Sequence, residues 1–183
     1  MKSTLLLICF LVGMLSGFSP AVAGTVHVSH EERAGDFLQL AIPVAAYATT
    51  FYLDDGTGRM QLSKSFATTL GTVFTLKYTV KTKRPNGYHQ SFPSAHTAAA
   101  FSGAAFVQRR YGWTYGVPLY LSAGFVGWSR IYSDHHYPSD VYAAAALAIA
   151  VNCFFVEQRQ ADDPLLSVWS DGRSLGLALN GHW

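Results

Sequence analysis

The sequence predicts an all-α protein: a compact bundle of about five to six helices with a short irregular or single-strand C-terminal tail. Apolar residues recur at helical spacing along most of the chain, whereas the alternation typical of strands is scarce before residues 174–183. Gly and Pro residues separate the apolar segments. Closely spaced Ala and Gly residues, as in residues 98–104, would let these helices pack closely.

Five segments are expected to be helical, each bounded by turn-forming residues. They cover residues 36–53, 60–80, 97–111, 118–131 and 139–158. A turn at residues 54–58 separates the first two, Pro93-Ser94 precedes the third, and Gly112 ends it. Residues 174–183 alternate, which predicts a single strand or a docked tail and indicates no function.

Residues 1–23 have the pattern of a secretory signal peptide. Lys2 gives a positive start, residues 5–15 are apolar, and Ala21-Val22-Ala23 forms a small-residue cleavage site. An uncleaved membrane anchor is the alternative, although the apolar core is short for one. We therefore expect residues 24–183 to form a single exported domain.

Composition limits the classes of function. The chain carries 13 Lys+Arg against 11 Asp+Glu without a basic block, which argues against nucleic-acid binding. Residues 24–183 contain one cysteine, Cys153, so no internal disulfide is expected, and its apolar neighbours predict a core position. The apolar runs of about 11 to 17 residues are shorter than the roughly 20 of a membrane span, which favours a soluble bundle.

A polar stretch, QSFPSAHT at residues 90–97, leads directly into an alanine-rich segment. Ser94 is a favourable N-cap, and the residues after it would offer unpaired backbone N–H groups. Together with the helix dipole, these groups would attract an anion such as phosphate. The dipole disfavours protonation of His96 until an anion binds beside it, and a protonated His96 could then act as a general acid.

A second polar stretch, residues 128–140, precedes the last predicted helix. Pro138 suits the first turn of that helix, which leaves His136 in the preceding loop with Asp140 in reach. A carboxylate bonded to one ring nitrogen fixes the tautomer and leaves the other nitrogen free to attack. Arg130 offers a planar fork suited to phosphate oxygens. Four further cations precede the first stretch: Lys77, Lys81, Lys83 and Arg84.

Two other kinds of site are disfavoured. The metal ligands on offer would be His89, His96, His135, His136, Asp134 and Asp140. They show no H-E-x-x-H or C-x-x-C spacing, and the nearby Lys and Arg residues would repel a cation, so we expect no metal. A serine hydrolase is also disfavoured, because the sequence lacks a G-x-S-x-G elbow.

Three motifs occur in order along the chain. Lys77 is followed by Arg84-Pro85, then comes PSAH at residues 93–96, and Ser129-Arg130 is followed by His136 and Asp140. This arrangement closely resembles the three-part signature of the type-2 phosphatidic acid phosphatase superfamily, which includes bacterial class A acid phosphatases and vanadium haloperoxidases. The resemblance covers residues 77–140 by motif and extends to the helical bundle by fold.

The resemblance implies a phosphatase that needs no metal or cofactor and works through a phosphohistidine intermediate. His136 would be the nucleophile, Asp140 would orient it, and His96 would protonate the leaving oxygen. The phosphate would be bound by Lys77, Arg84, Ser94, the backbone N–H of Ala95, and Arg130.

Two features depart from the family pattern. Ala95 stands where the family usually has glycine, which would add strain of about 1 kcal/mol if its φ were positive and would place a methyl near the pocket. Residues 86–92 form a shorter gap than usual, which leaves little room for a substrate-covering loop. His89 and His135 match no catalytic position and are expected at the rim or in structural roles, while Asp134 is expected to steady its loop.

Phosphate monoesters or diphosphates of lipids are the expected substrates, because aromatic residues near the motifs would suit a lipid tail: Tyr78, Tyr88, Phe92, Trp128 and Tyr132. The alternatives are a non-specific soluble acid phosphatase, a vanadate-dependent haloperoxidase and a non-catalytic phosphate-binding protein. The signal segment, the absence of disulfides and the resemblance favour a bacterial periplasm, with the protein soluble or in contact with a membrane surface. No nucleic-acid partner is expected, and the oligomeric state is left open.

Overall fold

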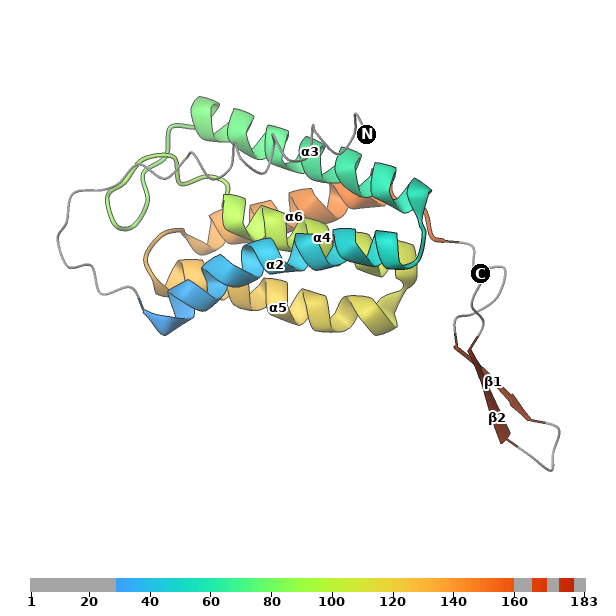
Figure 1. Cartoon of the computed structure of the whole chain (residues 1–183). Coiled ribbons are helices and arrows are strands. Elements are labelled where there is room, and N and C mark those ends of the chain that lie inside the picture. The colour runs from blue at the N-terminus through green and yellow to red at the C-terminus, as the bar shows by residue number, and fades with distance from the viewer. Residues whose placement is uncertain (1–28, 160–165, 171–174, 180–183) are drawn as a thin grey trace.

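The computed structural model describes residues 29–159, 166–170 and 175–179. Within them it contains α2 (His30–Tyr52), α3 (Gly56–Thr79), α4 (Ala95–Tyr111), α5 (Trp113–Tyr132) and α6 (Pro138–Phe155) (Figure 1). The predicted all-α bundle is therefore confirmed. The predicted signal peptide, residues 1–23, lies outside the described residues and stays a prediction.

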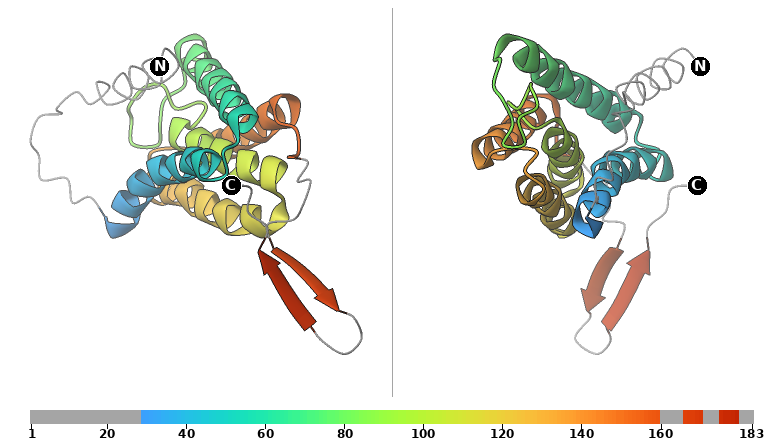
Figure 2. Two further views of the ribbon diagram at one scale, coloured as in Figure 1. Left: turned by 45° about the vertical axis from the view of Figure 1, so that its right-hand side comes forward. Right: turned by 90° about the vertical axis from the view of Figure 1, so that its left-hand side faces the viewer.

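Helix α4 forms the centre of the bundle and contacts each of the other four helices (Figures 1 and 2). Its small side chains are almost fully buried: Ala98, Ala99, Ala100, Ala104 and Ala105. At Gly103 an added Cβ would lie 2.9 Å from the Cα of Pro43, so only glycine lets α2 approach this closely. The short side chains thus gather the helices that carry the motif residues around one central helix.

Three helices begin several residues earlier than predicted: α2, α3, which starts at Gly56 within the predicted turn, and α5. Helix α2 starts at His30 because Ser29 caps it, with the Ser29 Oγ accepting a hydrogen bond from the backbone N–H of Glu32 (3.2 Å). Helix α5 starts directly after Gly112, whose φ of +97° lets the chain turn from α4 into α5. Pro118, the predicted start of that helix, lies inside it.

The C-terminal tail contains two strands rather than one. Strand β1 (Leu166–Ser170) pairs antiparallel with β2 (Leu175–Leu179), with Leu166 opposite Leu179. The predicted strand covers β2. Its partner was missed because two consecutive apolar residues, Val168 and Trp169, interrupt the alternation of β1.

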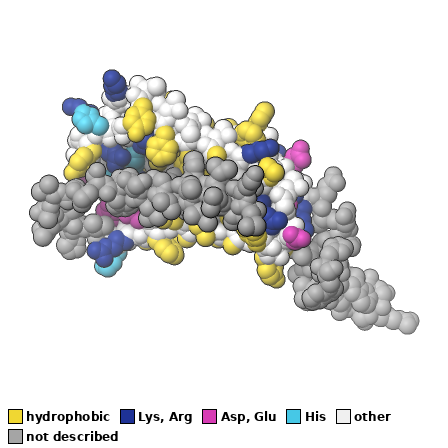
Figure 3. All heavy atoms as spheres, turned by 45° about the horizontal axis from the view of Figure 1, so that its top comes forward, with side chains coloured by type: hydrophobic (Ala, Val, Ile, Leu, Met, Phe, Trp, Pro, Cys, Tyr) yellow, Lys and Arg dark blue, Asp and Glu magenta, His cyan; other side chains and the backbone are white. Residues whose placement is uncertain are grey.

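Many large hydrophobic side chains stay exposed on the helices. Figure 3 shows them scattered over one face, with Lys and Arg side chains toward both ends of the bundle and His side chains toward the end where Figure 1 draws the loop between α3 and α4. One helix of the described part, α6, is long and apolar enough to cross a membrane by length and composition, and 28% of it is buried. The length argument against a span therefore fails for α6. Cys153, on this helix, is exposed, so its predicted core position is wrong.

Candidate active site

The predicted anion site is built on the first turn of α4. Ser94 is the N-cap, and its Oγ accepts hydrogen bonds from the backbone N–H (3.4 Å) and the hydroxyl (3.0 Å) of Thr97. The Ser94 N–H donates to the backbone carbonyl of Asp140 (3.1 Å), which ties this turn to the start of α6. The N–H groups of a first helical turn have no partner inside the helix, and the dipole is positive there. This end of α4 is therefore suited to an anion.

Ala95 causes no backbone strain in place of the family glycine. It is the first residue of α4, and it is absent from the described non-glycine residues with positive φ. Its methyl group packs against a core cluster formed by Val73, Ala98 and Ala144. The side chain thus contributes to the core.

Lys77 and Arg84 converge on the segment that leads into α4. Lys77, in the last turn of α3, is 6% exposed, and its Nζ donates to the carbonyl of Gln90 (2.8 Å). Burial, followed by the charge of Arg84, lowers the pKa of Lys77 to about 8. The Arg84 Nε is buried and has no hydrogen-bond partner among the described residues. Such a buried, unpaired N–H is costly unless a ligand or water accepts from it.

His136 and Asp140 are buried together, each 3% exposed. The His136 Nδ1 lies 3.5 Å from the Asp140 Oδ2, and among the described residues it makes no hydrogen bond. The two groups are in contact, but at a distance longer than a typical hydrogen bond. The same Asp140 oxygen accepts from the Ser91 hydroxyl (2.5 Å) and from the backbone N–H of Tyr137 (3.0 Å). These two donors fix the carboxylate that faces the ring.

His136 is held in its neutral form. Burial, followed by the charges of Lys77 and Arg84, lowers the pKa of His136 to about 2. A neutral imidazole keeps a lone pair on one ring nitrogen, so it can act as a nucleophile. The environment therefore suits His136 to attack an electrophile rather than to donate a proton.

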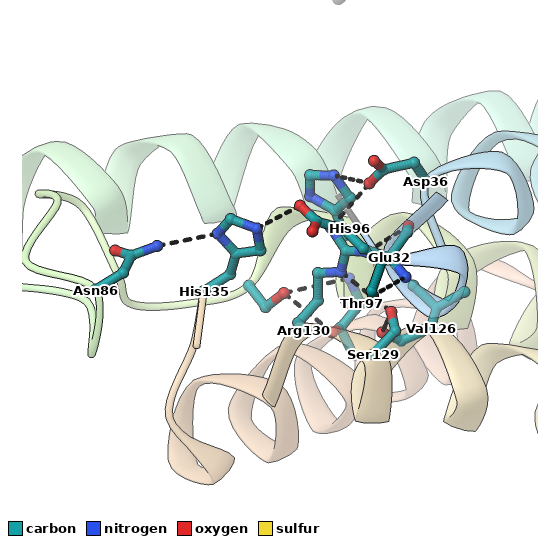
Figure 4. A network of polar contacts seen from close by, with 11 residues as sticks. Glu32, Asp36, Asn86, His96, Thr97, Val126, Ser129, Arg130 and His135 are labelled. Carbon is teal, nitrogen blue, oxygen red and sulfur yellow. Dashed lines mark hydrogen bonds and ion pairs between the residues drawn. The ribbon is translucent and has the colours of Figure 1, made fainter. Parts of the chain in front are cut away.

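Arg130 is held by α2, a helix that the sequence motifs do not include (Figure 4). Arg130 is 3% exposed; its Nη1 donates to the Asp36 Oδ1 and its Nη2 to the carbonyl of Glu32, each at 2.8 Å. The same Asp36 oxygen lies 3.3 Å from the Nε2 of His96. Helix α2 comes this close because residue 35 is glycine, where an added Cβ would lie 2.8 Å from the Arg130 Nη2.

His96 and Asp36 influence each other's protonation. Burial lowers the pKa of His96, and the Asp36 carboxylate opposes this effect. The His96 side chain is 34% exposed, so solvent moderates the cost of charging it. Burial raises the pKa of Asp36, but the contacts with His96 and Arg130 outweigh burial and leave that pKa lowered. An ionised Asp36 therefore stabilises the proton on His96.

A second contact from α2 steadies the loop before α6 (Figure 4). The Glu32 Oε1 lies 2.6 Å from the Nε2 of His135, and the His135 Nδ1 lies 3.1 Å from the Nδ2 of Asn86. The Asn86 N–H donates to the carbonyl of Asp134 (3.1 Å). His135 and Asp134 thus have the structural positions expected of them. His89 forms an isolated β-bridge with Lys83 in the exposed loop.

The structure brings the predicted site residues together at one end of the bundle and adds three that the sequence analysis missed: Glu32, Asp36 and Ser91. The Ser29-x-x-Glu32 spacing is a capping-box pattern that would have placed the first two on a helix. Nothing local would have paired them with Arg130. Within the described residues, no group of three or more His, Cys, Asp or Glu side chains is arranged to hold a metal ion.

A family model described as the PAP2 superfamily matches residues 58–163. The chain belongs to the PAP2 superfamily. The match contains every motif residue from Lys77 to Asp140, and the resemblance drawn from the three motifs is confirmed. It begins after α2, so Glu32 and Asp36 lie outside the PAP2 match.

Three curated proteins are similar to this PAP2 chain. Lipid A 1-phosphatase of Porphyromonas gingivalis is 40% identical over 101 residues, 51% of this chain and 22% of that protein. Undecaprenyl-diphosphatase BcrC of Bacillus subtilis is 37% identical over 81 residues, 43% of this chain and 40% of that protein. Lipid A 4'-phosphatase of Helicobacter pylori is 28% identical over 117 residues, 57% of this chain and 59% of that protein. The chain thus matches less than two thirds of the length of each relative.

A solved structure supports the fold. The crystal structure of Aquifex aeolicus LpxE superposes with a TM-score of 0.61 and 20% sequence identity, covering 73% of this chain and 87% of that one. A helix arrangement like this one has therefore been seen by experiment.

Proposed function

We propose that this protein is a metal-independent phosphatase that hydrolyses phosphate monoesters or diphosphates of lipids through a phosphohistidine intermediate. One observation carries the proposal: a buried, neutral His136 lies near two cations, Lys77 and Arg84, and Arg84 has a buried N–H without a partner in the described residues. That combination suits a nucleophile beside a bound phosphoryl group. Relatives named for lipid A and undecaprenyl diphosphate support a lipid substrate.

The first step would transfer the phosphoryl group to the protein. The Nε2 of His136, the ring nitrogen not facing Asp140, attacks phosphorus while the bond from phosphorus to the leaving oxygen breaks. His96 gives its proton to that oxygen, and the lipid alcohol or lipid phosphate departs. The phosphorylated ring becomes positively charged, and Asp140, 3.5 Å from its Nδ1, offsets that charge.

The second step would return the protein to its starting state. Neutral His96 takes a proton from a water molecule as that water attacks the phosphohistidine. The bond between phosphorus and the His136 nitrogen breaks, and inorganic phosphate leaves. In both steps Lys77, Arg84 and Arg130 would stabilise the charge on the phosphoryl oxygens, and this is the largest rate contribution that we expect.

Exposed aromatic side chains on the helix that carries Arg130 support a lipid substrate. Trp128 and Tyr132 stack with ring centroids 5.1 Å apart and are 46% and 59% exposed. They belong to the same helix as Arg130, within one turn of it. Rings that are apolar but end in a polar atom suit a surface between water and acyl chains. We propose that this surface meets the membrane in which the substrate lies.

Export to a bacterial periplasm is part of the proposal, and it rests on residues 1–23, outside the described part of the chain. If these residues are a cleaved signal peptide, N-terminal sequencing of the protein from an expressing bacterium will start at Gly24. A start at Met1 would favour an uncleaved anchor.

The test is phosphate release by the full-length chain in detergent micelles with EDTA. The substrates are long-chain lipid phosphates, prenyl diphosphates and soluble esters, and the variants are His136→Ala and, as a matched control at an exposed position, His30→Ala. We expect release that resists EDTA, prefers the lipid substrates, disappears in His136→Ala and persists in His30→Ala. With radiolabelled substrate, a base quench should leave a label on the chain that acid removes.

Three results would contradict the proposal in different ways. A folded wild type without release, or a fully active His136→Ala, would overturn the mechanism. A preference for soluble esters would favour a non-specific acid phosphatase. Halide oxidation with vanadate and peroxide, without phosphate release, would favour a haloperoxidase.

A further inference from the structure

Helix α2 supplies a carboxylate that touches two residues of the proposed site. The Asp36 Oδ1 accepts from the Arg130 Nη1 at 2.8 Å and lies 3.3 Å from the His96 Nε2 (Figure 4). The Asp36 side chain is 43% exposed, whereas that of Arg130 is 3% exposed. Asp36 therefore stands at the open edge of the site, between the proposed acid and one of the phosphate-binding cations.

We propose that Asp36 is a positioning residue of this active site, which fixes the Arg130 fork and favours the protonated form of His96 that donates to the leaving oxygen. The inference rests on the proposed phosphatase function and deepens it. It concerns a residue before position 58, where the PAP2 match begins.

The contacts of Arg130 account for the first role. Its Nε donates to the Ser129 Oγ (3.2 Å), its Nη1 to Asp36 and its Nη2 to the carbonyl of Glu32. These bonds use three of the five N–H donors of a guanidinium and leave one on each terminal nitrogen. A bidentate bond to phosphate requires the plane of the fork to be fixed. Asp36 is the charged member of the three anchors, so its loss would loosen that plane most.

The surroundings of His96 account for the second role. Arg130 from α5, Arg84 from the loop before α4, and His136 from the loop before α6 all belong to the site around it. The arginines and the α4 dipole disfavour a protonated ring, and Asp36 from α2 opposes them. Because Asp36 contacts Nε2, the proton on Nδ1 is the one available for transfer. After that transfer the Nε2–H of His96 still donates to Asp36, and the deprotonated Nδ1 can accept the proton of the attacking water.

This arrangement matters most for poor leaving groups. An aliphatic alcohol must be protonated as it departs, because its alkoxide is strongly basic, whereas nitrophenolate leaves readily without a proton. The dependence on the leaving group therefore separates an effect on the acid from a general loss of structure.

The experiment compares Asp36→Asn with Asp54→Asn, a matched control whose side chain is 99% exposed at the other end of α2. Initial rates are measured across pH in detergent with a long-chain alkyl phosphate and with 4-nitrophenyl phosphate. For Asp36→Asn we expect kcat/KM to fall about 10- to 100-fold with the alkyl ester. With the nitrophenyl ester, which leaves without a proton, only the loosened Arg130 fork should count, and we expect a loss about tenfold smaller. Activity falls as pH rises through the pKa of His96, which gives the pH–rate profile a descending limb. Removal of the Asp36 carboxylate should move this limb to lower pH. Asp54→Asn should match the wild type.

The outcomes separate this inference from the proposed function. A wild type that releases no phosphate, or an active His136→Ala, overturns the proposed function. An active wild type with unchanged rates and an unchanged limb in Asp36→Asn overturns only the role of Asp36. Equal losses with both esters at an unchanged limb overturn its role toward His96 and support its role toward Arg130. If Asp36→Asn does not fold, Asp36→Glu keeps the charge. We expect it to retain the wild-type limb with a lower rate, and a shifted limb would count against the inference.

Discussion

Two buried arginines bind aspartates at opposite ends of α2, and their surroundings differ. Arg110 donates to Asp55 through both Nε and Nη2, each at 2.7 Å, whereas Arg130 donates to Asp36 through Nη1 alone, at 2.8 Å. Asp55 is 5% exposed as a residue, while the side chain of Asp36 is 43% exposed. One pair is closed to solvent and the other opens toward it.

The closed pair has a partner for each group that it buries. Asp55 also accepts from the Tyr111 hydroxyl (2.9 Å) and the Gly58 N–H (2.8 Å), and the Arg110 Nη1 donates to the carbonyl of Glu157 (3.0 Å). This network joins the turn between α2 and α3 to the ends of α4 and α6. Its hydrogen bonds are complete without a ligand, which is typical of a structural network.

The open pair lies in a network with unfilled hydrogen-bonding capacity. Within the described residues, the Arg84 Nε and the His136 Nδ1 are buried without partners. Buried groups of this kind, together with strongly shifted pKa values, are typical of functional sites. The same residue types therefore stabilise the fold at one end of the bundle and leave room for chemistry at the other.

The largest expected effect is on activity at the open end. Arg130→Ala removes the guanidinium that we place on the phosphoryl group, and we expect kcat/KM to fall about 1,000-fold. The free energy of unfolding should change much less, because Asp36 can be solvated once its partner is gone. Phosphate release and thermal unfolding, measured on the same sample, check both halves. A loss of activity below tenfold would remove Arg130 from the site.

At the closed end the effects should be reversed. Arg110→Ala leaves the carboxylate of Asp55 buried with two weaker donors, so we expect the free energy of unfolding to fall by about 3–5 kcal/mol. The kcat of the folded fraction should stay within about twofold of the wild type, since the network touches no proposed site residue.

Tyr111→Phe tests the same network with a smaller expected loss of stability. It removes one hydrogen bond to a charged acceptor, which is worth about 1.5–3 kcal/mol, and it keeps the ring that packs on Phe106. Chemical or thermal denaturation with circular dichroism gives both values. If either variant lowered kcat as much as it lowered stability, the division between the two ends would be wrong.

Acid should weaken the closed end specifically. Burial raises the pKa of Asp55, but the bonds from Arg110, Gly58 and Tyr111 outweigh it and lower that pKa to about 2, from 3.8. A carboxyl group whose pKa is depressed in the folded state stabilises the fold above its unfolded pKa. That contribution is lost as pH falls from about 4 to about 2, and it amounts to about 2 kcal/mol. Unfolding measured at pH 5 and pH 2.5 should show a steeper loss in the wild type than in Asp55→Asn, and equal losses would refute this assignment.

The sequence allowed the motif residues to be recognised, but it did not predict the contacts that they make. The motif residues could be recognised because a capped helix start, a histidine with a nearby carboxylate and a fork for phosphate are all local patterns. The contact of Asp36 with Arg130 depends on a close helix approach at Gly35, and the contact of Asp55 with Arg110 joins residues far apart in the chain. Such tertiary pairs leave no trace in local spacing.

The errors in the fold also have physical causes. Capping set the start of α2 at Ser29, where the apolar period had not yet begun. Cys153 lies in a helix that is apolar on every side, so the sequence could not separate its buried face from its exposed one. The tail was predicted as a single strand because the alternation within one short strand does not reveal which segment pairs with it.

The smallest expected effects are changes in stability from substitutions at the capped starts of α4 and α3. Ala95→Gly should lower the free energy of unfolding by less than about 1 kcal/mol, because glycine costs conformational entropy and loses a methyl contact in the core. The N–H that faces the proposed phosphate is kept, so activity should stay within about twofold.

The matched exchange at the start of α3, Gly58→Ala, should destabilise more, because its Cβ would lie 2.7 Å from the Cγ of Asp55. Phosphate release and denaturation curves for both variants test this difference. A rise in activity above about tenfold in Ala95→Gly would mean that the methyl group obstructs the phosphate, against the core position that its contacts indicate. If both variants had similar free energies of unfolding, the turn at Asp55 would accommodate the added methyl group at little cost. The closed network would then not be rigid at that turn.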